Sequence, residues 1–396
     1  MYKRQAYIEH LLAHKDKDYI KVVTGIRRSG KSTILLQYQD ELKKQGISEK
    51  QIIQKNFDDL ENEEFLDYRL LYKKLLEETP AKNERYYIFL DEIQMVSHFE
   101  KVLASLQLKK NIDIYITGSN AYLLSGDLAT LLSGRFVEIL VLPFSFNEYY
   151  DYLGGDKNQA FQNYLENGGF PYAASISDKR TFDDYIQGVL NTVLVKDVMN
   201  RKKFTDSLIL ESIAKFIFSN VGSLTTIKGI SNALISANRK TTAPTVENYL
   251  SGLMDALIIY KVDRFNISGK KYLHLNSKYY LADLSLKNAY LGKKRPNRGH
   301  DLENIVYIEL VRRGYNIYVG DTKAGEVDFV AVKEGVTTYY QVSSTVKDEN
   351  TYQREISSLQ AISDNYRKIL LTEDLGNYND NGIEQINLID WLITEI

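Results

Sequence analysis

A glycine-rich segment near the start of the chain has the residue types that bind a polyphosphate. It reads Gly25-Ile-Arg-Arg-Ser-Gly-Lys-Ser32 and fits the pattern G-x-x-x-x-G-K-[ST]. Its glycines let main-chain N–H groups point into a concavity, Lys31 would reach the β- and γ-phosphates, and the Ser32 hydroxyl would complete Mg²⁺ coordination. The residues predicted to bind ATP are Gly25, Ile26, Arg27, Arg28, Ser29, Gly30, Lys31, Ser32 and Thr33.

Two adjacent carboxylates follow a second apolar segment. Residues 86–90 read as a buried strand and run directly into Asp91 and Glu92. Asp91 would hold Mg²⁺, and Glu92 would orient and deprotonate the attacking water. An acidic strand end that is merely solvated is the alternative, but the two motifs together favour a nucleotide site, with the two strands expected to be neighbours.

A third strand, predicted at residues 112–117, leads into Gly118-Ser119-Asn120. Polar side chains there would emerge beside the γ-phosphate, so Asn120 is the first candidate to position water and Ser119 the second. A helix N-cap for residues 121–132 explains either side chain equally well.

An arginine then precedes the last predicted strand of this region. Arg135 is a candidate arginine finger, which would direct its guanidinium at the γ-phosphate of a neighbouring subunit and would therefore require a homo-oligomer. The alternative is a structural arginine that pairs with a carboxylate.

These motifs need a scaffold that brings strand ends together. Strands near residues 20, 53, 88, 114 and 139, separated by helical stretches, predict an α/β fold in which residues 1–150 form an αβα P-loop sandwich. No Asn-Lys-x-Asp element that would read guanine follows, so ATP is preferred over GTP. The predicted cofactors are ATP and Mg²⁺.

Composition limits the other classes of function. The chain has 396 residues and 50 basic against 52 acidic side chains, so two or three domains are expected and no overall field attracts nucleic acid or lipid. Cysteine is absent, which excludes disulfides, zinc ribbons and thiol nucleophiles. No window approaches the roughly 18 apolar residues of a membrane span, so we expect a cytoplasmic protein without a membrane partner.

The middle of the chain reads as mainly helical. Residues 151–204 are predicted to form a helical linker or lid, and residues 205–290 three helices followed by a hairpin around Ser268-Gly269, which resembles a winged helix. The third helix exposes Glu247, Asn248 and Asp255 rather than basic residues. Basic residues lie instead in loops, at Arg239, Lys240, Lys293, Lys294, Arg295 and Arg298. DNA binding and a solvated or protein-docking surface therefore both stay open.

The last region, residues 296–396, predicts a helix, three strands and a second helix, an order that resembles the restriction-endonuclease-like fold. The positions matching that fold's metal site are Glu303, Asp328, Gln341 and Ser343. Glutamine brings no negative charge and serine cannot act as the cationic partner, so we expect no nuclease activity, although Lys347 could reach in. Alternatively, Glu303 is a surface charge and Asp328 pairs with Lys323 or Arg312.

Motifs along the whole chain resemble prokaryotic AAA-type ATPases in which a P-loop domain precedes a region of uncharacterised function. The similar elements are residues 25–32, 90–94, 117–119, 133–135, 168–171, 278–283, 326–330 and 340–343. The resemblance implies an ATPase whose cellular client is unknown. We therefore expect an Mg-dependent ATP hydrolase that couples its nucleotide state to its C-terminal domains. An ATP-regulated nuclease and a nucleotide-gated module that binds DNA or protein are the alternatives.

Overall fold

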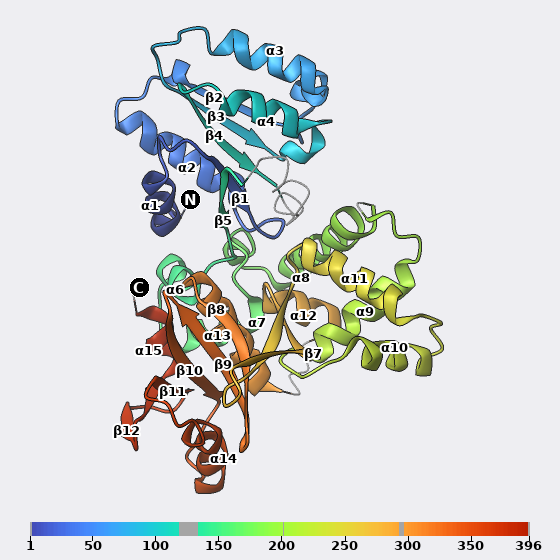
Figure 1. The fold of residues 1–396 in the computed structure, drawn as a ribbon, viewed down its shortest axis with the longest axis vertical. Coiled ribbons are helices and arrows are strands. Elements are labelled where there is room, and N and C mark those ends of the chain that lie inside the picture. The colour runs from blue at the N-terminus through green and yellow to red at the C-terminus, as the bar shows by residue number, and fades with distance from the viewer. Residues whose placement is uncertain (1, 119–133, 201, 293–296, 395–396) are drawn as a thin grey trace. The chain divides into compact units, whose positions relative to one another are not determined.

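The structure is a computed structural model that describes residues 2–118, 134–200, 202–292 and 297–394. It divides into two compact units (Figure 1). The first holds Met1–Leu142 with the short segment Asp255–Leu257, and the second holds Pro143–Met254 and Ile258–Ile396.

The first unit alternates helices and strands. Its helices are α1 (Gln5–Ala13), α2 (Lys31–Lys44), α3 (Tyr68–Glu78) and α4 (Phe99–Gln107), and its strands are β1 (Ile20–Thr24), β2 (Ile52–Asn56), β3 (Tyr86–Asp91), β4 (Ile112–Thr117) and β5 (Phe136–Leu140). The strands form one parallel sheet in the order β2-β3-β4-β1-β5. The five predicted strands and the parallel αβα architecture are confirmed.

One expectation about the sheet was wrong. The strand that carries Asp91 does not neighbour the strand before the glycine-rich loop, because β4 lies between β3 and β1. Val23 on β1 is paired with Thr117 on β4. The end of β4 therefore separates the two motifs and can contact both.

Helices cover both faces of this sheet, so its central strands are apolar on both sides. Every residue of β1, β3 and β4 is buried. Successive strand residues point to opposite faces. Val22, Ile88 and Ile114 pack in one cluster with residues of α3 and α4, and Val23, Phe89 and Tyr115 pack in the other with residues of α1 and α2.

The second unit begins with helices and ends in a large sheet. Its helices are α6 (Phe146–Leu153), α7 (Lys157–Asn167), α8 (Lys179–Thr192), a π-helix (Val193–Asn200), α9 (Ser207–Ser219), α10 (Ile227–Ser236), α11 (Ala243–Asp255), α12 (Leu284–Leu291), α13 (Arg298–Arg312), α14 (Glu349–Gln360) and α15 (Leu388–Ile393). Its strands are β6 (Ile259–Asn266), β7 (Lys271–Leu281), β8 (Asn316–Thr322), β9 (Gly325–Lys333), β10 (Val336–Ser343), β11 (Arg367–Thr372), β12 (Tyr378–Asp380) and β13 (Ile383–Asn387).

The predicted hairpin exists, and it is part of the large sheet of the second unit. β6 and β7 pair antiparallel, and β6 also pairs with β8 through residues 264–266. The hairpin is thus one edge of the eight-stranded sheet β12-β13-β11-β10-β9-β8-β6-β7, which crosses the expected boundary between residues 290 and 296. The three helices predicted before it are present as α9, α10 and α11; the winged-helix interpretation stays a prediction.

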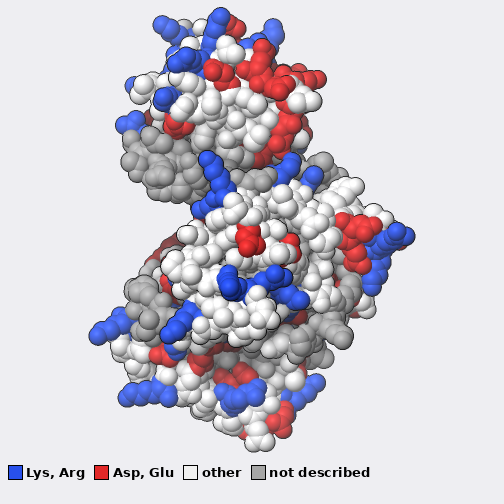
Figure 2. Space-filling view, turned by 90° about the vertical axis from the view of Figure 1, so that its right-hand side faces the viewer, with Lys and Arg blue, Asp and Glu red and all other residues white. Residues whose placement is uncertain are grey.

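The surface gives limited support for a nucleic-acid site. Figure 2 shows one face, on which Lys and Arg side chains lie in small separate groups. Glu247 and Asn248 are exposed on α11, as are Arg239 and Lys240 in the preceding loop. Arg298 is held by Glu373, with 2.7 Å between Nε and Oε2, while residues 293–295 lie outside the described part of the chain.

Among the helices that are described, none is long and apolar enough to cross a bilayer.

Candidate functional site

The glycine-rich loop has a backbone that only glycine fits at two points. Gly25 has φ 148°, and a Cβ added there would lie 2.2 Å from the carbonyl oxygen of Val141. Gly30 has φ 98° and occupies the N-cap of α2. Side chains are disfavoured in this part of backbone space, so the loop keeps its tight turn and its close approach to Val141, just after β5, only with glycine.

Lysine and serine side chains line the loop. Lys31 is buried, and its Nζ donates to the carbonyl oxygens of Gly25 at 3.0 Å and Ile26 at 3.4 Å. The buried Ser29 hydroxyl has no hydrogen-bond partner among the described residues, and Ser32 is exposed on the first turn of α2. An ammonium and hydroxyls at a helix N-terminus fit a phosphate and a hydrated Mg²⁺.

The two carboxylates after β3 are linked by a residue that sequence reasoning missed. The Thr117 hydroxyl donates to Asp91 Oδ1, and its oxygen accepts from the main-chain N–H of Glu92 at 3.0 Å. Thr117 is fully buried at the end of β4, next to Val23 on β1. The structure therefore places Asp91 and Glu92 at the same edge of the sheet as the glycine-rich loop. The available signal was that Thr117 is the last residue of a predicted strand.

Glu92 is held in an unusual conformation. It has φ 55°, which is uncommon for a residue with a side chain, and the Gln94 amide donates to its Oε2. Strained backbone of this kind concentrates at functional sites. Gln94 thus orients the carboxylate that was predicted to act as the base.

The remaining predicted catalytic residues are placed differently. Arg135 is exposed, and its carbonyl oxygen accepts from the N–H of Ile20 at the start of β1. It therefore lies at the opposite end of the sheet from the glycine-rich loop, roughly 16 Å away along a five-residue strand. Asn120 and Ser119 lie outside the described residues.

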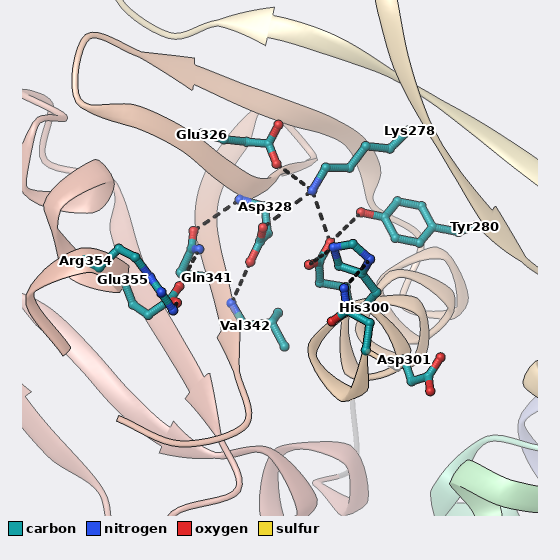
Figure 3. Close-up of polar contacts among 12 residues, drawn as sticks. Lys278, Tyr280, His300, Asp301, Glu326, Asp328, Gln341, Val342, Arg354 and Glu355 are labelled. Atoms are coloured by element: carbon teal, nitrogen blue, oxygen red, sulfur yellow. Dashed lines mark hydrogen bonds and ion pairs between the residues drawn. The ribbon is translucent and has the colours of Figure 1, made fainter. Parts of the chain in front are cut away.

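A second polar cluster lies in the C-terminal sheet (Figure 3). Lys278 on β7 points at three carboxylates: its Nζ lies 3.1 Å from Glu303 Oε2, 2.6 Å from Glu326 Oε1 and 3.6 Å from Asp328 Oδ1. The Tyr280 hydroxyl donates to the same oxygen of Glu303 at 3.2 Å. The side chains of Lys278, Glu303 and Asp328 are buried, whereas Glu326 is 29% exposed, so the cluster reaches solvent on the Glu326 side.

The alternative partners and positions that the sequence suggested for Asp328, Glu303 and Lys347 were wrong. Asp328 pairs with Lys278 rather than with Lys323 or Arg312, and Glu303 is a buried residue rather than a surface charge. Lys347 does not reach in, because it is exposed and lies 3.8 Å from Asp374.

Gln341 and Ser343, the two positions that lack the charges of a nuclease site, form other hydrogen bonds. The Gln341 side-chain oxygen accepts from the N–H of Asp328 at 3.3 Å, and its amide donates to Glu355 at 2.9 Å. The Ser343 hydroxyl donates to the carbonyl oxygen of Thr345 at 3.1 Å. Neither side chain supplies a charge to the cluster, as expected from the sequence.

The single ammonium of Lys278 offsets part of the negative charge of the three carboxylates. Burial alone would lower the pKa of the Lys278 ammonium, but the three carboxylates outweigh burial and raise that pKa above its usual value. Burial, assisted by the charge of Glu303, raises the pKa of Asp328 well above its usual value. Within the described residues no group of three or more acidic or histidine side chains is arranged to hold a metal ion. Lys278 is thus the cation that these carboxylates surround.

Comparison with known proteins gives the family. Residues 17–150 match the model of an AAA domain, and residues 158–297 match a domain of unknown function (DUF8612). An uncharacterized protein of Haemophilus influenzae is 40% identical over 402 aligned positions, which cover 99% of this chain and 99% of that protein. This chain belongs to the family of that protein. Its first unit carries the match to the AAA domain and has the fold of a Walker-type ATPase.

Two more distant likenesses agree with this assignment. An uncharacterized protein of Methanocaldococcus jannaschii is 29% identical, with 94% of this chain and 85% of that protein covered. The solved structure of a Walker-type ATPase of Pyrococcus abyssi matches with a TM-score of 0.51 and 15% identity, covering 74% of this chain and 96% of that one. At that identity the second likeness concerns the fold alone.

In the second unit, a buried aspartate joins two of the motif elements noted in the sequence. Asp283 accepts the N–H of Gly169 at 2.6 Å and also caps α12 by accepting the N–H of Ser285 at 2.9 Å. Gly168 lies against it, since an added Cβ would sit 1.8 Å from Asp283 Oδ1. Burial raises the pKa of Asp283 to about 6, although hydrogen bonds from Ser285 and Gly169 oppose the change.

This raised pKa predicts a pH-dependent contribution to stability. The folded protein takes up the proton near pH 6 and the unfolded chain near its ordinary, lower pKa, so Asp283 stabilises the fold more at acid pH and this contribution is lost as pH rises through 6. The Asp283→Asn variant does not titrate there. We expect the difference in unfolding free energy between the two proteins to change by about 1.4 kcal/mol between about pH 7.5 and pH 5 in urea titrations. Parallel pH profiles would contradict the assignment.

Proposed function

We propose that this AAA domain binds Mg·ATP at the loop of residues 25–33 and hydrolyses it, and that the nucleotide state is coupled to the second unit. The observation that carries the proposal is the Thr117 bridge, which ties Asp91 and Glu92 to the edge of the sheet from which the loop emerges. A phosphate-binding loop and a metal-binding carboxylate at one sheet edge are what phosphoryl transfer requires.

Each side chain has a separate role in this proposal. Lys31 exchanges its bonds to the carbonyl oxygens of Gly25 and Ile26 for bonds to phosphate oxygens. Ser32 and Asp91 hold Mg²⁺, which when bound neutralises charge on the phosphate oxygens. Glu92, oriented by Gln94, accepts a proton from the attacking water.

Equilibrium binding tests the first half of this proposal. Purified protein should bind ATP in the presence of Mg²⁺ more tightly than in its absence, because the metal offsets repulsion between the phosphates and Asp91. ATP should also bind more tightly than GTP, since no guanine-reading element follows the loop. Equal affinity for the two nucleotides would refute the preference for ATP, and absence of binding would refute the site.

The position of Arg135 is consistent with the proposed role as an arginine finger between molecules. It lies at the end of the sheet away from its own nucleotide loop, so we propose that its guanidinium serves the site of a second copy. We expect Arg135→Ala to leave ATP affinity within a few fold and to reduce turnover on the order of 10³-fold. The measurement is specific activity against protein concentration. Activity that does not depend on concentration, in a sample shown to be monomeric, would instead favour a structural arginine.

The C-terminal sheet is proposed to bind rather than to cut. The helix–strand order still resembles the restriction-endonuclease-like fold, but Lys278 occupies the centre of the carboxylates that would hold a metal there. An ammonium in that position cannot lower the pKa of a water in the way a divalent cation does. We therefore propose ATP hydrolysis in the first unit and no catalysis in the C-terminal sheet.

A further inference from the structure

A buried arginine near the N-terminus contacts the main chain of the glycine-rich loop. Arg4 is 3% exposed, and its Nη1 donates to the carbonyl oxygen of Ser29 at 3.2 Å and to that of Leu142 at 2.8 Å. Its guanidinium also lies 4.4 Å from the centre of the Tyr7 ring. One side chain therefore joins the loop to a residue more than a hundred positions later in the chain.

The segment that Arg4 reaches contacts β1, the loop and α1 at further points. The N–H of Val141 donates to the carbonyl oxygen of Thr24 at 2.7 Å, and the carbonyl oxygen of Val141 packs against Gly25. The N–H of Leu142 donates to the Tyr7 hydroxyl at 3.1 Å. Both main-chain groups of Leu142 are thus bonded to the N-terminal segment that carries Arg4.

Leu142 is also the residue at which the chain leaves the first unit. The next two residues are bonded within the second unit: Arg312 donates to the carbonyl oxygen of Pro143 at 2.7 Å, and the N–H of Phe144 donates to Gly169 at 2.7 Å. The Tyr164 hydroxyl donates to the carbonyl oxygen of Phe144 at 2.8 Å. Leu142 is therefore hydrogen-bonded within the first unit, and Pro143 and Phe144 are hydrogen-bonded within the second.

Nucleotide binding acts on this arrangement from the loop side. In the proposed function Lys31 turns from the carbonyl oxygens of Gly25 and Ile26 to phosphate oxygens, and the N–H of Ser29 is bonded to that same Ile26 oxygen. A change in the bonding of Ile26 thus acts on Ser29, whose carbonyl oxygen is the one that Arg4 holds.

We propose that Arg4 is a positioning residue that transmits the nucleotide state of the loop to Leu142, where the ATPase unit continues into the second unit. The inference rests on the proposed function, because it requires ATP to bind at this loop. Arginine suits the role because its several N–H donors are fixed in one plane, so a single side chain can hold two carbonyl oxygens while it stacks on an aromatic ring.

Hydrogen–deuterium exchange of the peptide that spans residues 141–144 tests the proposal. In the wild-type full chain, a non-hydrolysable ATP analogue with Mg²⁺ should change exchange of this peptide by about threefold or more. Arg4→Met should still bind the analogue, within about tenfold of wild-type affinity, but should lose this change. Lys3→Met is the matched control, because Lys3 is the neighbouring exposed residue and pairs with Glu41.

The outcomes separate this inference from the function on which it rests. If the wild-type protein binds the analogue without any change at residues 141–144, or if Arg4→Met keeps the change, the coupling is refuted while the nucleotide site stands. If the wild-type protein binds no analogue, the proposed function itself fails. Should Arg4→Met not fold, Tyr7→Phe removes only the hydroxyl bonded to Leu142 and should reduce the change in exchange; an unaltered response would overturn the proposal.

Discussion

The Glu92→Gln variant is expected to bind Mg·ATP with nearly wild-type affinity and to hydrolyse it at least about 10²-fold more slowly. Glutamine keeps the size and hydrogen bonding of the side chain but cannot accept a proton from water. Lys31→Ala should instead lose ATP binding, because it removes the buried ammonium that compensates phosphate charge. Equilibrium ATP binding and steady-state phosphate release, measured on the same preparations, separate these two effects.

The matched control is Glu61→Gln, since Glu61 is an exposed acid of the same unit. It should behave as the wild-type protein in both assays. Wild-type turnover in Glu92→Gln would show that another group activates the water. Retained ATP binding in Lys31→Ala would show that the nucleotide is held elsewhere.

The Lys278→Met variant is expected to be the most destabilised single substitution in the second unit, by about 3–5 kcal/mol. Methionine retains the length of the side chain but leaves Glu303, Glu326 and Asp328 close together without their cation. Unfolding in urea, followed by fluorescence of the single Trp391, reports on this unit. Neither the wild-type protein nor Lys278→Met should nick and relax supercoiled plasmid in the presence of Mg²⁺ or Mn²⁺.

A surface ion pair provides the comparison for Lys278. Lys347 is exposed and lies 3.8 Å from Asp374, so Lys347→Met should change stability by less than about 1 kcal/mol. Adding Asp328→Asn to Lys278→Met should recover part of the lost stability, because it removes one uncompensated carboxylate. A Lys278→Met protein as stable as the Lys347→Met control would contradict the account of the cluster.

The nucleotide site was the part of the molecule most accessible from the sequence. The loop of residues 25–32 and the pair Asp91 and Glu92 follow buried strands directly, and such local order is enough to predict a shared sheet edge. Thr117 was missed because its role depends on β4 lying between the two motif strands. Strand order of that kind is set by long-range pairing rather than by neighbouring residues.

The C-terminal cluster shows a second limit. Glu303 and Asp328 were singled out from their positions in a helix and a strand, and the structure does bring them together. Their cation was not predicted, because Lys278 lies on β7, in a hairpin assigned to the preceding region. Only the pairing of β6 with β8 carries that hairpin into the C-terminal sheet. An isolated lysine at the start of the buried, largely apolar run of residues 279–282 was the available signal.

Steady-state phosphate release from Mg·ATP, by the purified wild-type chain and by Lys31→Ala prepared in parallel, tests the central claim most directly. The account predicts sustained release by the wild-type protein, dependence on Mg²⁺, and loss of the activity in Lys31→Ala. Equal release by the two proteins would contradict it, as would a wild-type protein that binds ATP but releases no phosphate under any of these conditions.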